Sequence, residues 1–233
     1  MNQSISQKTE QNKENGLVNI LVNIIIPTVV MMKFSKPEYL GEVKGLIVAL
    51  SFPVSYGVYD LLKKSKVNFI SVLGLISILM TGGIGLLKLD RNWMIVKETA
   101  IPFIIGIVVL ISQRTSYPLV KTFLGQILDL DKVRQAYSEH STEIVLEKQL
   151  KISSWLLAFT FFLSALLNFI LATIVLKGEP GTTEFVESLG RMTFLSFPVI
   201  TLPMMIMMGI IIYYLFHGIK KNTTLELEEI FRS

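Results

Sequence analysis

Apolar residues fall into six long runs along the chain, separated by shorter polar stretches. Each run is close to the ~20 residues that an α-helix needs to cross the hydrocarbon core of a bilayer. The predicted spans are Leu17–Phe34, Gly45–Leu62, Val67–Leu87, Trp93–Ser112, Ser153–Leu176 and Met192–Phe216. The pattern therefore predicts an all-α, polytopic membrane helical bundle of about six transmembrane helices.

The polar stretches divide the chain into tails, a membrane part and a connector. The predicted parts are a tail at 1–16, helices one to four within 17–112, a connector at 113–151, helices five and six within 152–217, and a tail at 218–233. The first tail has no basic segment or small-residue cleavage site of the kind that marks a signal peptide. We therefore expect the first helix to stay in the membrane.

The connector, residues 113–151, is a long polar stretch between the fourth and fifth predicted spans. Residues 117–128 are amphipathic enough to lie on the membrane surface, and Asp129–Lys151 is typical of a single charged helix. His140 lies between Glu139 and Glu143. Two carboxylates and one imidazole make a poor metal site without further ligands, so we interpret them as a solvated face and expect no metal.

Composition supports the membrane class and excludes several others. Of 233 residues, 51% are hydrophobic and 17% charged, the mean hydropathy is +0.56 and there are no cysteines. Soluble domains carry ~25% charged residues. A soluble globular enzyme, a disulfide scaffold and a thiolate metal site are therefore excluded, and we expect no cofactor and no nucleic-acid partner.

The distribution of the 22 lysines and arginines predicts the orientation. Fourteen lie in the two tails, the loop after the second span and the connector, seven lie in the three other loops, and Lys97 lies inside a span. Because positive residues in short loops favour the cytoplasmic side, both termini are predicted to be cytoplasmic. Trp93 and Trp155 fall at predicted interfaces, where their rings are favoured.

Polar side chains in the first two spans are the first candidate ligands. Asn19, Asn23 and Pro27 share one helix face, and Pro27 leaves the Asn23 carbonyl without its helical donor. These amides either pack between helices or bind a polar ligand. In span two, Tyr56 and Asp60 are four residues apart. Asp60 either pairs with a neighbouring lysine or lies at a cavity mouth.

Span four contains the sharpest candidates, Lys97 and Glu98. A helix that began after Glu98 would run only about 21 Å, at ~1.5 Å per residue, before Ser112. Both charges are therefore predicted to lie inside the membrane boundary, where ionisable residues are functional candidates. Adjacent residues project about 100° apart, so we expect no simple same-face pair, and each should need its own partner or a shared polar cavity.

Small and polar residues form helical stripes in the remaining spans. Thr160, Ser164 and Asn168 follow one face of span five; Ser77, Thr81 and Gly85 follow one face of span three. Both stripes favour close helix packing, with Asn168 kept as a candidate ligand. In span six, two prolines five residues apart, at 198 and 203, predict a kink.

Four segments together resemble one bacterial family. They are Phe52–Asp60, Lys66–Gly74, Leu79–Leu87 and Lys97–Pro102. The chain resembles small integral membrane proteins labelled intracellular septation protein A-like, of which some are labelled major-facilitator-like transporters. The resemblance implies the inner membrane of a bacterium and a link to envelope or division machinery, and it supplies no catalytic residues.

Two functions follow from these observations. The first is a small transporter, assembled as two copies, that moves a polar solute or lipid through a site between spans one, two and four. The second is a non-catalytic scaffold of envelope or septum assembly that binds partner proteins through 113–151. No nucleophile, metal or phosphate-binding motif is present, so we do not expect an enzyme.

Overall fold

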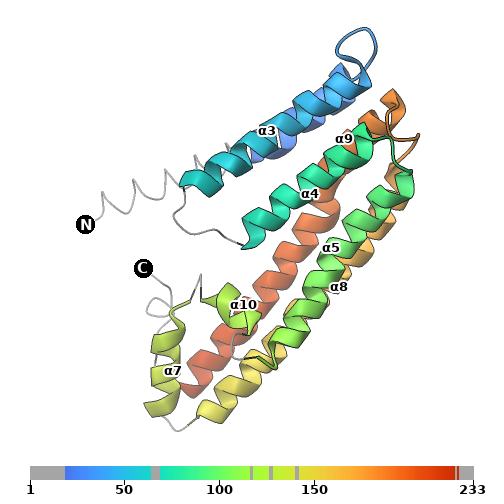
Figure 1. The fold of residues 1–233 in the computed structure, drawn as a ribbon. Coiled ribbons are helices and arrows are strands. Elements are labelled where there is room, and N and C mark those ends of the chain that lie inside the picture. Colours follow the sequence, from blue (N-terminus) through green and yellow to red (C-terminus); the bar gives the residue numbers. More distant parts are fainter. Residues whose placement is uncertain are drawn as a thin grey trace. The chain divides into compact units, whose positions relative to one another are not determined.

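The computed structural model describes residues 19–63, 69–115, 118–125, 128–139, 142–223 and 225. Within these ranges the chain is helical and contains no strand, which confirms the all-α prediction (Figure 1). The elements are η1 (Leu21–Ile25), α2 (Ile26–Val29), η2 (Val30–Phe34), α3 (Gly41–Lys63), α4 (Phe69–Leu86), α5 (Arg91–Ser112), α6 (Leu119–Leu124), α7 (Leu130–Glu139), α8 (Glu143–Val175), α9 (Thr183–Ser196), η3 (Phe197–Thr201) and α10 (Leu202–Asn222).

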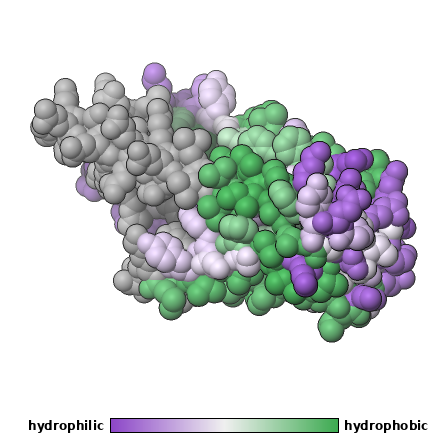
Figure 2. Space-filling model, turned by 90° about the horizontal axis from the view of Figure 1, so that it is seen from above, coloured by the Kyte–Doolittle hydropathy of each residue, from purple (hydrophilic) through white to green (hydrophobic). Residues whose placement is uncertain are grey.

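In the described part of the chain, three helical segments are long and apolar enough to cross a membrane. They are α5, α8 and the continuous segment Thr183–Asn222. Leu21–Phe34 and Val72–Leu86 are shorter apolar helical segments. Many large apolar side chains on the three long segments are exposed, among them Ile104, Phe159 and Ile206, and Figure 2 shows hydrophobic residues over broad areas of the visible face. Such a surface is typical of a protein whose surroundings are lipid.

Helix boundaries differ from the predictions at two places. The segment Asp129–Lys151 is not one charged helix, because α7 ends at Glu139 and α8 begins at Glu143. The first turns of α8 are charged and lie outside the apolar run, so hydropathy placed the start of this helix ten residues late. The last predicted span likewise begins earlier, because α9 starts at Thr183 with the Thr182 side chain accepting a hydrogen bond from the Phe185 N–H.

Prolines in the first and last apolar segments coincide with π-helical turns. η1 and η2 lie on either side of Pro27, and η3 contains Pro198. The Ile26 N–H donates to the Leu21 carbonyl, one residue further back than in an α-helix. Prolines lack the N–H that continues an α-helix, and such π-turns frequently mark functional sites.

The chain divides into two compact units. The first contains residues 1–98 and 169–197, and the second contains 99–168 and 198–233. In the first unit, α3 packs against α4, η2 and α2, and α9 packs against η2 and α2. Glycines make these contacts close: Gly85 and Gly82 of α4 lie against Leu46 and Leu50 of α3. This confirms the packing role predicted for part of the span-three stripe.

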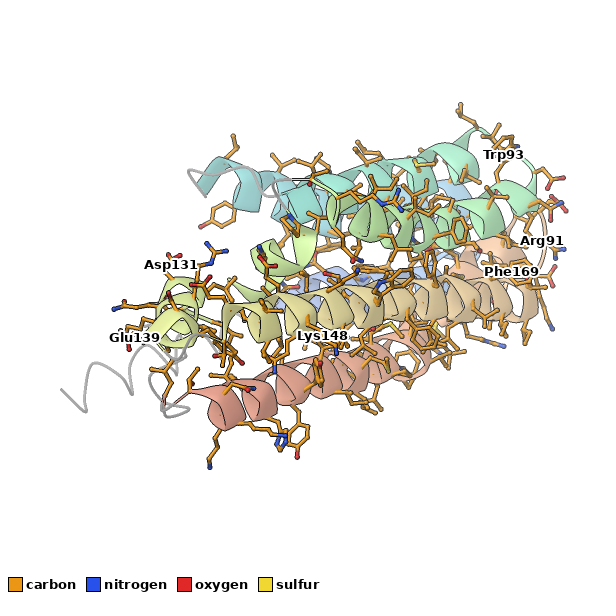
Figure 3. The ribbon with its side chains drawn as sticks, turned by 90° about the horizontal axis from the view of Figure 1, so that it is seen from below. Arg91, Trp93, Asp131, Glu139, Lys148 and Phe169 are labelled. Carbon is orange, nitrogen blue, oxygen red and sulfur yellow. The ribbon has the colours of Figure 1, made fainter. Side chains whose placement is uncertain are left out.

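The core of the second unit lies around α7 and the facing parts of α8 and α10. Val133 and Tyr137 of α7 are buried together with Leu146 and Leu150 of α8 and Leu215 of α10. Their helical spacing puts one apolar face of α7 inward, and Asp131 and Glu139 lie on its exposed side (Figure 3). The connector therefore contains a helix that is anchored by packing rather than only solvated.

Candidate functional site

Lys97 lies buried in α5 with a complete set of polar partners. It lies six positions after Arg91, the first residue of α5, or about 9 Å along the helix axis at ~1.5 Å per residue. Its Nζ donates to Glu98 Oε1 at 2.6 Å, Thr81 Oγ1 at 2.7 Å and Ser77 Oγ at 3.3 Å. An ammonium has three donors, so each has an acceptor here. We call Ser77, Thr81, Lys97 and Glu98 the lysine cluster.

The Thr81 hydroxyl is oriented to accept from Lys97. Its own proton is donated to the Ser77 carbonyl at 3.0 Å, four residues earlier in α4. The lone pairs of Oγ1 are then available to the ammonium. The hydroxyl thus links the α4 backbone to the Lys97 side chain on α5.

Glu98 is the more accessible half of the ion pair. Its side chain is 24% exposed, against 3% for Lys97. The prediction that adjacent residues would form no simple pair was wrong, because the long stem of lysine lets Nζ turn back to its neighbour. Lys97 in addition has partners of its own, the two hydroxyls of α4. A bound cation or proton could therefore reach Glu98 more readily than an anion could reach Lys97.

Asn19, Asn23 and Tyr56 form a second polar cluster in the same unit. Asn23 Nδ2 donates to Asn19 Oδ1 at 2.9 Å, and Asn19 Nδ2 donates to the Tyr56 hydroxyl at 3.3 Å. Asn19 is exposed, and Asn23 and Tyr56 are half-buried. The structure thus brings three predicted residues together, and this cluster joins the first apolar helix to α3.

The partners of the buried lysine come from a helix outside the predicted site. The sequence assigned the site to spans one, two and four, whereas Ser77 and Thr81 lie on α4, the third predicted span. Among the described residues no hydrogen bond or ion pair joins the lysine cluster to the asparagine cluster. The i, i+4 spacing of Ser77 and Thr81 was visible in the sequence, but it identified a face and not the neighbour of that face.

The remaining candidates lie elsewhere. Asn168 belongs to the second unit, where its Nδ2 donates to the Ser164 carbonyl at 2.9 Å within α8. Such a bond back to the preceding turn satisfies the amide locally. The Asp60 side chain and His140 lie outside the described residues.

Sequence reasoning missed a polar network in the second unit. The buried Tyr137 hydroxyl donates to Gln149 Oε1 at 2.7 Å, and the Gln149 side chain lies directly against Gly218 of α10. Burial raises the pKa of Tyr137, partly offset by hydrogen bonds to Asn222 and Gln149. The signal for this tyrosine was the i, i+3, i+4 spacing of Val133, Ala136 and Tyr137.

Comparisons of the chain with protein-family models, curated proteins and solved structures found no match.

Proposed function

We propose that the protein is a small multi-pass transporter-like protein that moves a polar solute across the membrane, with the lysine cluster as its polar centre. The observation that supports this is the Lys97–Glu98 pair inside an apolar helix that is long enough to span a bilayer. Charges at membrane depth are costly, so those that persist are functional candidates.

Glu98 would be the residue of the lysine cluster that interacts with the transported solute. Because it is partly exposed while Lys97 is buried, a proton or a cationic group of the solute would neutralise Glu98 first. Lys97 would then keep only its hydroxyl partners on α4, and the ion pair with Glu98 would be broken. A solute with a cationic group, or a neutral solute moved together with a proton, fits this order of events.

The membrane placement belongs to the same proposal. We place six crossings in the inner membrane of a bacterium, with both termini in the cytoplasm, as the lysine and arginine distribution favours. Support comes from the three long apolar segments, the two shorter ones and α3, whose 23 residues would extend about 34 Å at ~1.5 Å per residue. The family resemblance agrees with this placement.

Uptake by proteoliposomes tests the transport proposal. Wild-type vesicles and protein-free vesicles would be incubated with a mixture of amino acids, polyamines, nucleosides and sugars, and the contents measured by mass spectrometry. We expect uptake of at least one class by wild type and a fall of about tenfold or more for Glu98→Gln. Glu38→Gln, in an exposed loop, is the matched control.

Two results would contradict the proposal. Uptake by wild type that never exceeds the protein-free vesicles would exclude transport of these classes. Equal uptake by wild type and Glu98→Gln would exclude the lysine cluster as the site.

A scaffold is the second candidate, and the anchored helix α7 favours it. Asp131, Lys132, Arg134 and Glu139 are exposed on α7, while its apolar face is held in the core. A photoreactive amino acid at position 134 would capture partners in native membranes. The scaffold would be favoured if Lys132→Glu abolishes this capture and Glu98→Gln leaves it unchanged.

A further inference from the structure

An open groove of about 990 Å³ lies in the second unit, where the end of α5, the chain around α6 and the first turns of α8 meet. None of the residues of the lysine cluster lines it. Lys148, one of its lining residues, projects from α8 (Figure 3). This groove is therefore a site separate from the proposed transport centre.

The groove is strongly cationic. Arg114, Lys121, Lys148 and Lys151 line it, and Glu147 is its one carboxylate. Among the residues that the structure describes, none of these four cations lies within ion-pair distance of a carboxylate. Four cations that line one groove, without a carboxylate partner among the described residues, repel one another, and an anionic ligand would relieve that repulsion.

A hydrogen-bond donor without a partner among the described residues lies beside the groove. Gln113 lines it, and the Nε2 of this residue is buried with no partner among the described residues. A buried donor left unpaired costs about 1–3 kcal/mol, so such groups are normally satisfied by protein, water or ligand. Because this nitrogen is buried as it lies, the Gln113 side chain would rotate to present the amide to a phosphate oxygen, beside the cations of the groove.

Apolar side chains continue from the cationic part to the surface. Ile111, Ile144 and Trp155 line the groove and are 60%, 84% and 57% exposed. Ile111 lies in the last turn of α5 and Ile144 in the first turn of α8, and Trp155 lies twelve residues after the start of α8; both helices are long enough to span a bilayer. Exposed isoleucines beside a tryptophan are typical of the membrane interface, where acyl chains meet headgroups.

We propose that this groove binds the phosphate headgroup of an anionic phospholipid, with the cations and Gln113 on the phosphate and the acyl chains along Trp155, Ile111 and Ile144. Basic pockets between transmembrane helices recognise such headgroups. The apolar wall favours a lipid over free phosphate, because a free ion would leave that wall exposed to water.

Quenching of Trp155 by brominated lipids tests this binding. The chain has two tryptophans, so Trp93→Phe leaves Trp155 as the reporter. Full-length protein in this background would be titrated, in neutral detergent micelles, with phosphatidylglycerol or phosphatidylcholine brominated on the acyl chains, and in a separate arm with inorganic phosphate. We expect brominated phosphatidylglycerol to reach half-maximal quenching at a concentration at least about tenfold lower than brominated phosphatidylcholine does.

Two variants with equal charge loss separate the groove from general electrostatics. The groove variant changes Arg114, Lys121, Lys148 and Lys151 to Gln, and the control variant changes Lys132, Arg134, Lys220 and Lys221 to Gln. The four control residues are exposed and lie outside the groove, in the same unit. The preference for phosphatidylglycerol should disappear in the groove variant and persist in the control variant, with both eluting as wild type from size exclusion.

Three outcomes would overturn the proposal. One is equal quenching by the two brominated lipids in the Trp93→Phe protein. Another is equal loss of preference in the groove and control variants, which would indicate only net charge. The third is a shift of Trp155 emission by inorganic phosphate at the concentrations where the lipid acts, which would assign the site to a free anion. If the groove variant fails to fold, Gln113→Leu and Lys148→Gln, each tested singly, must each weaken the preference.

Discussion

The Lys97 ammonium lies 2.6 Å from the carboxylate of Glu98, its immediate neighbour in α5, while two hydroxyls of α4 complete its coordination. The buried ammonium thus has a partly exposed carboxylate as its counter-charge within the same helix turn, and its hydroxyl partners tie α5 to the preceding helix, α4. The pair and its hydroxyl partners form a structural link between α4 and α5, and mutation of each member tests that link.

Removing one partner of the pair should destabilise the protein more than removing both. Lys97→Met leaves Glu98 without its cation, and we expect a loss of about 1–3 kcal/mol. That is below the ~3–5 kcal/mol typical of fully buried pairs, because Glu98 is 24% exposed. Lys97→Met combined with Glu98→Gln should recover part of this loss. Unfolding in mixed micelles measures the free energy of unfolding of wild type, Lys97→Met and the double variant. A double variant less stable than Lys97→Met would refute the coupling.

The Thr81 hydroxyl should contribute to the contact between α4 and α5. Thr81→Val keeps the shape of the side chain but removes the acceptor for Lys97, and we expect a loss of about 1 kcal/mol. Thr81→Ser keeps the hydroxyl and is the matched control. Equal stability of the valine and serine variants would show that this hydrogen bond contributes nothing measurable.

Two glycines should be intolerant of alanine because backbone lies next to them. A Cβ on Gly45 would lie 2.9 Å from Ser35 Cα, and one on Gly190 would lie 2.8 Å from Met31 Cβ and 3.2 Å from the Thr28 carbonyl. We expect each substitution to cost about 1–3 kcal/mol. Gly83→Ala is the control, because nothing lies within 4 Å of its added Cβ. In thermal unfolding, Gly83→Ala should have a higher melting temperature than the alanine variants of Gly45 and Gly190. Equal melting temperatures of the three variants would contradict the close packing at these two glycines.

Tyr137 should make stability fall at alkaline pH. Burial raises its pKa above that of an unfolded tyrosine, ~10, so its contribution is complete below ~10 and is lost as pH rises toward the folded value. Tyr137→Phe removes this dependence and also the hydrogen bond to Gln149, at a cost of about 1–2 kcal/mol at pH 8. Denaturant unfolding at pH 8 and pH 11 should show a smaller difference in the free energy of unfolding between wild type and Tyr137→Phe at pH 11. A constant difference would contradict the assignment.

The sequence predicted the all-α class of the fold and the apolar helix that carries Lys97 and Glu98, because both depend on hydropathy. It could not predict that Ser77 and Thr81 would hold Lys97, since helical spacing defines a face but not the helix that covers it. The start of α8 was missed because charged first turns resemble a solvated connector even when the helix continues into an apolar run. Tyr137 was missed for the related reason that a polar segment can still bury one face.

The most direct test asks whether Glu98 meets water within the membrane. The chain has no cysteine, so Glu98→Cys introduces a single thiol. Thiolates react with charged, membrane-impermeant methanethiosulfonates only where water reaches them, and Lys97 favours the thiolate. Ile104→Cys, at a residue 56% exposed on the apolar part of α5, is the lipid-facing control. We predict that folded protein in liposomes is labelled at position 98 and not at 104. Labelling of Glu98→Cys only after denaturation would contradict the account and leave the pair as a packing element.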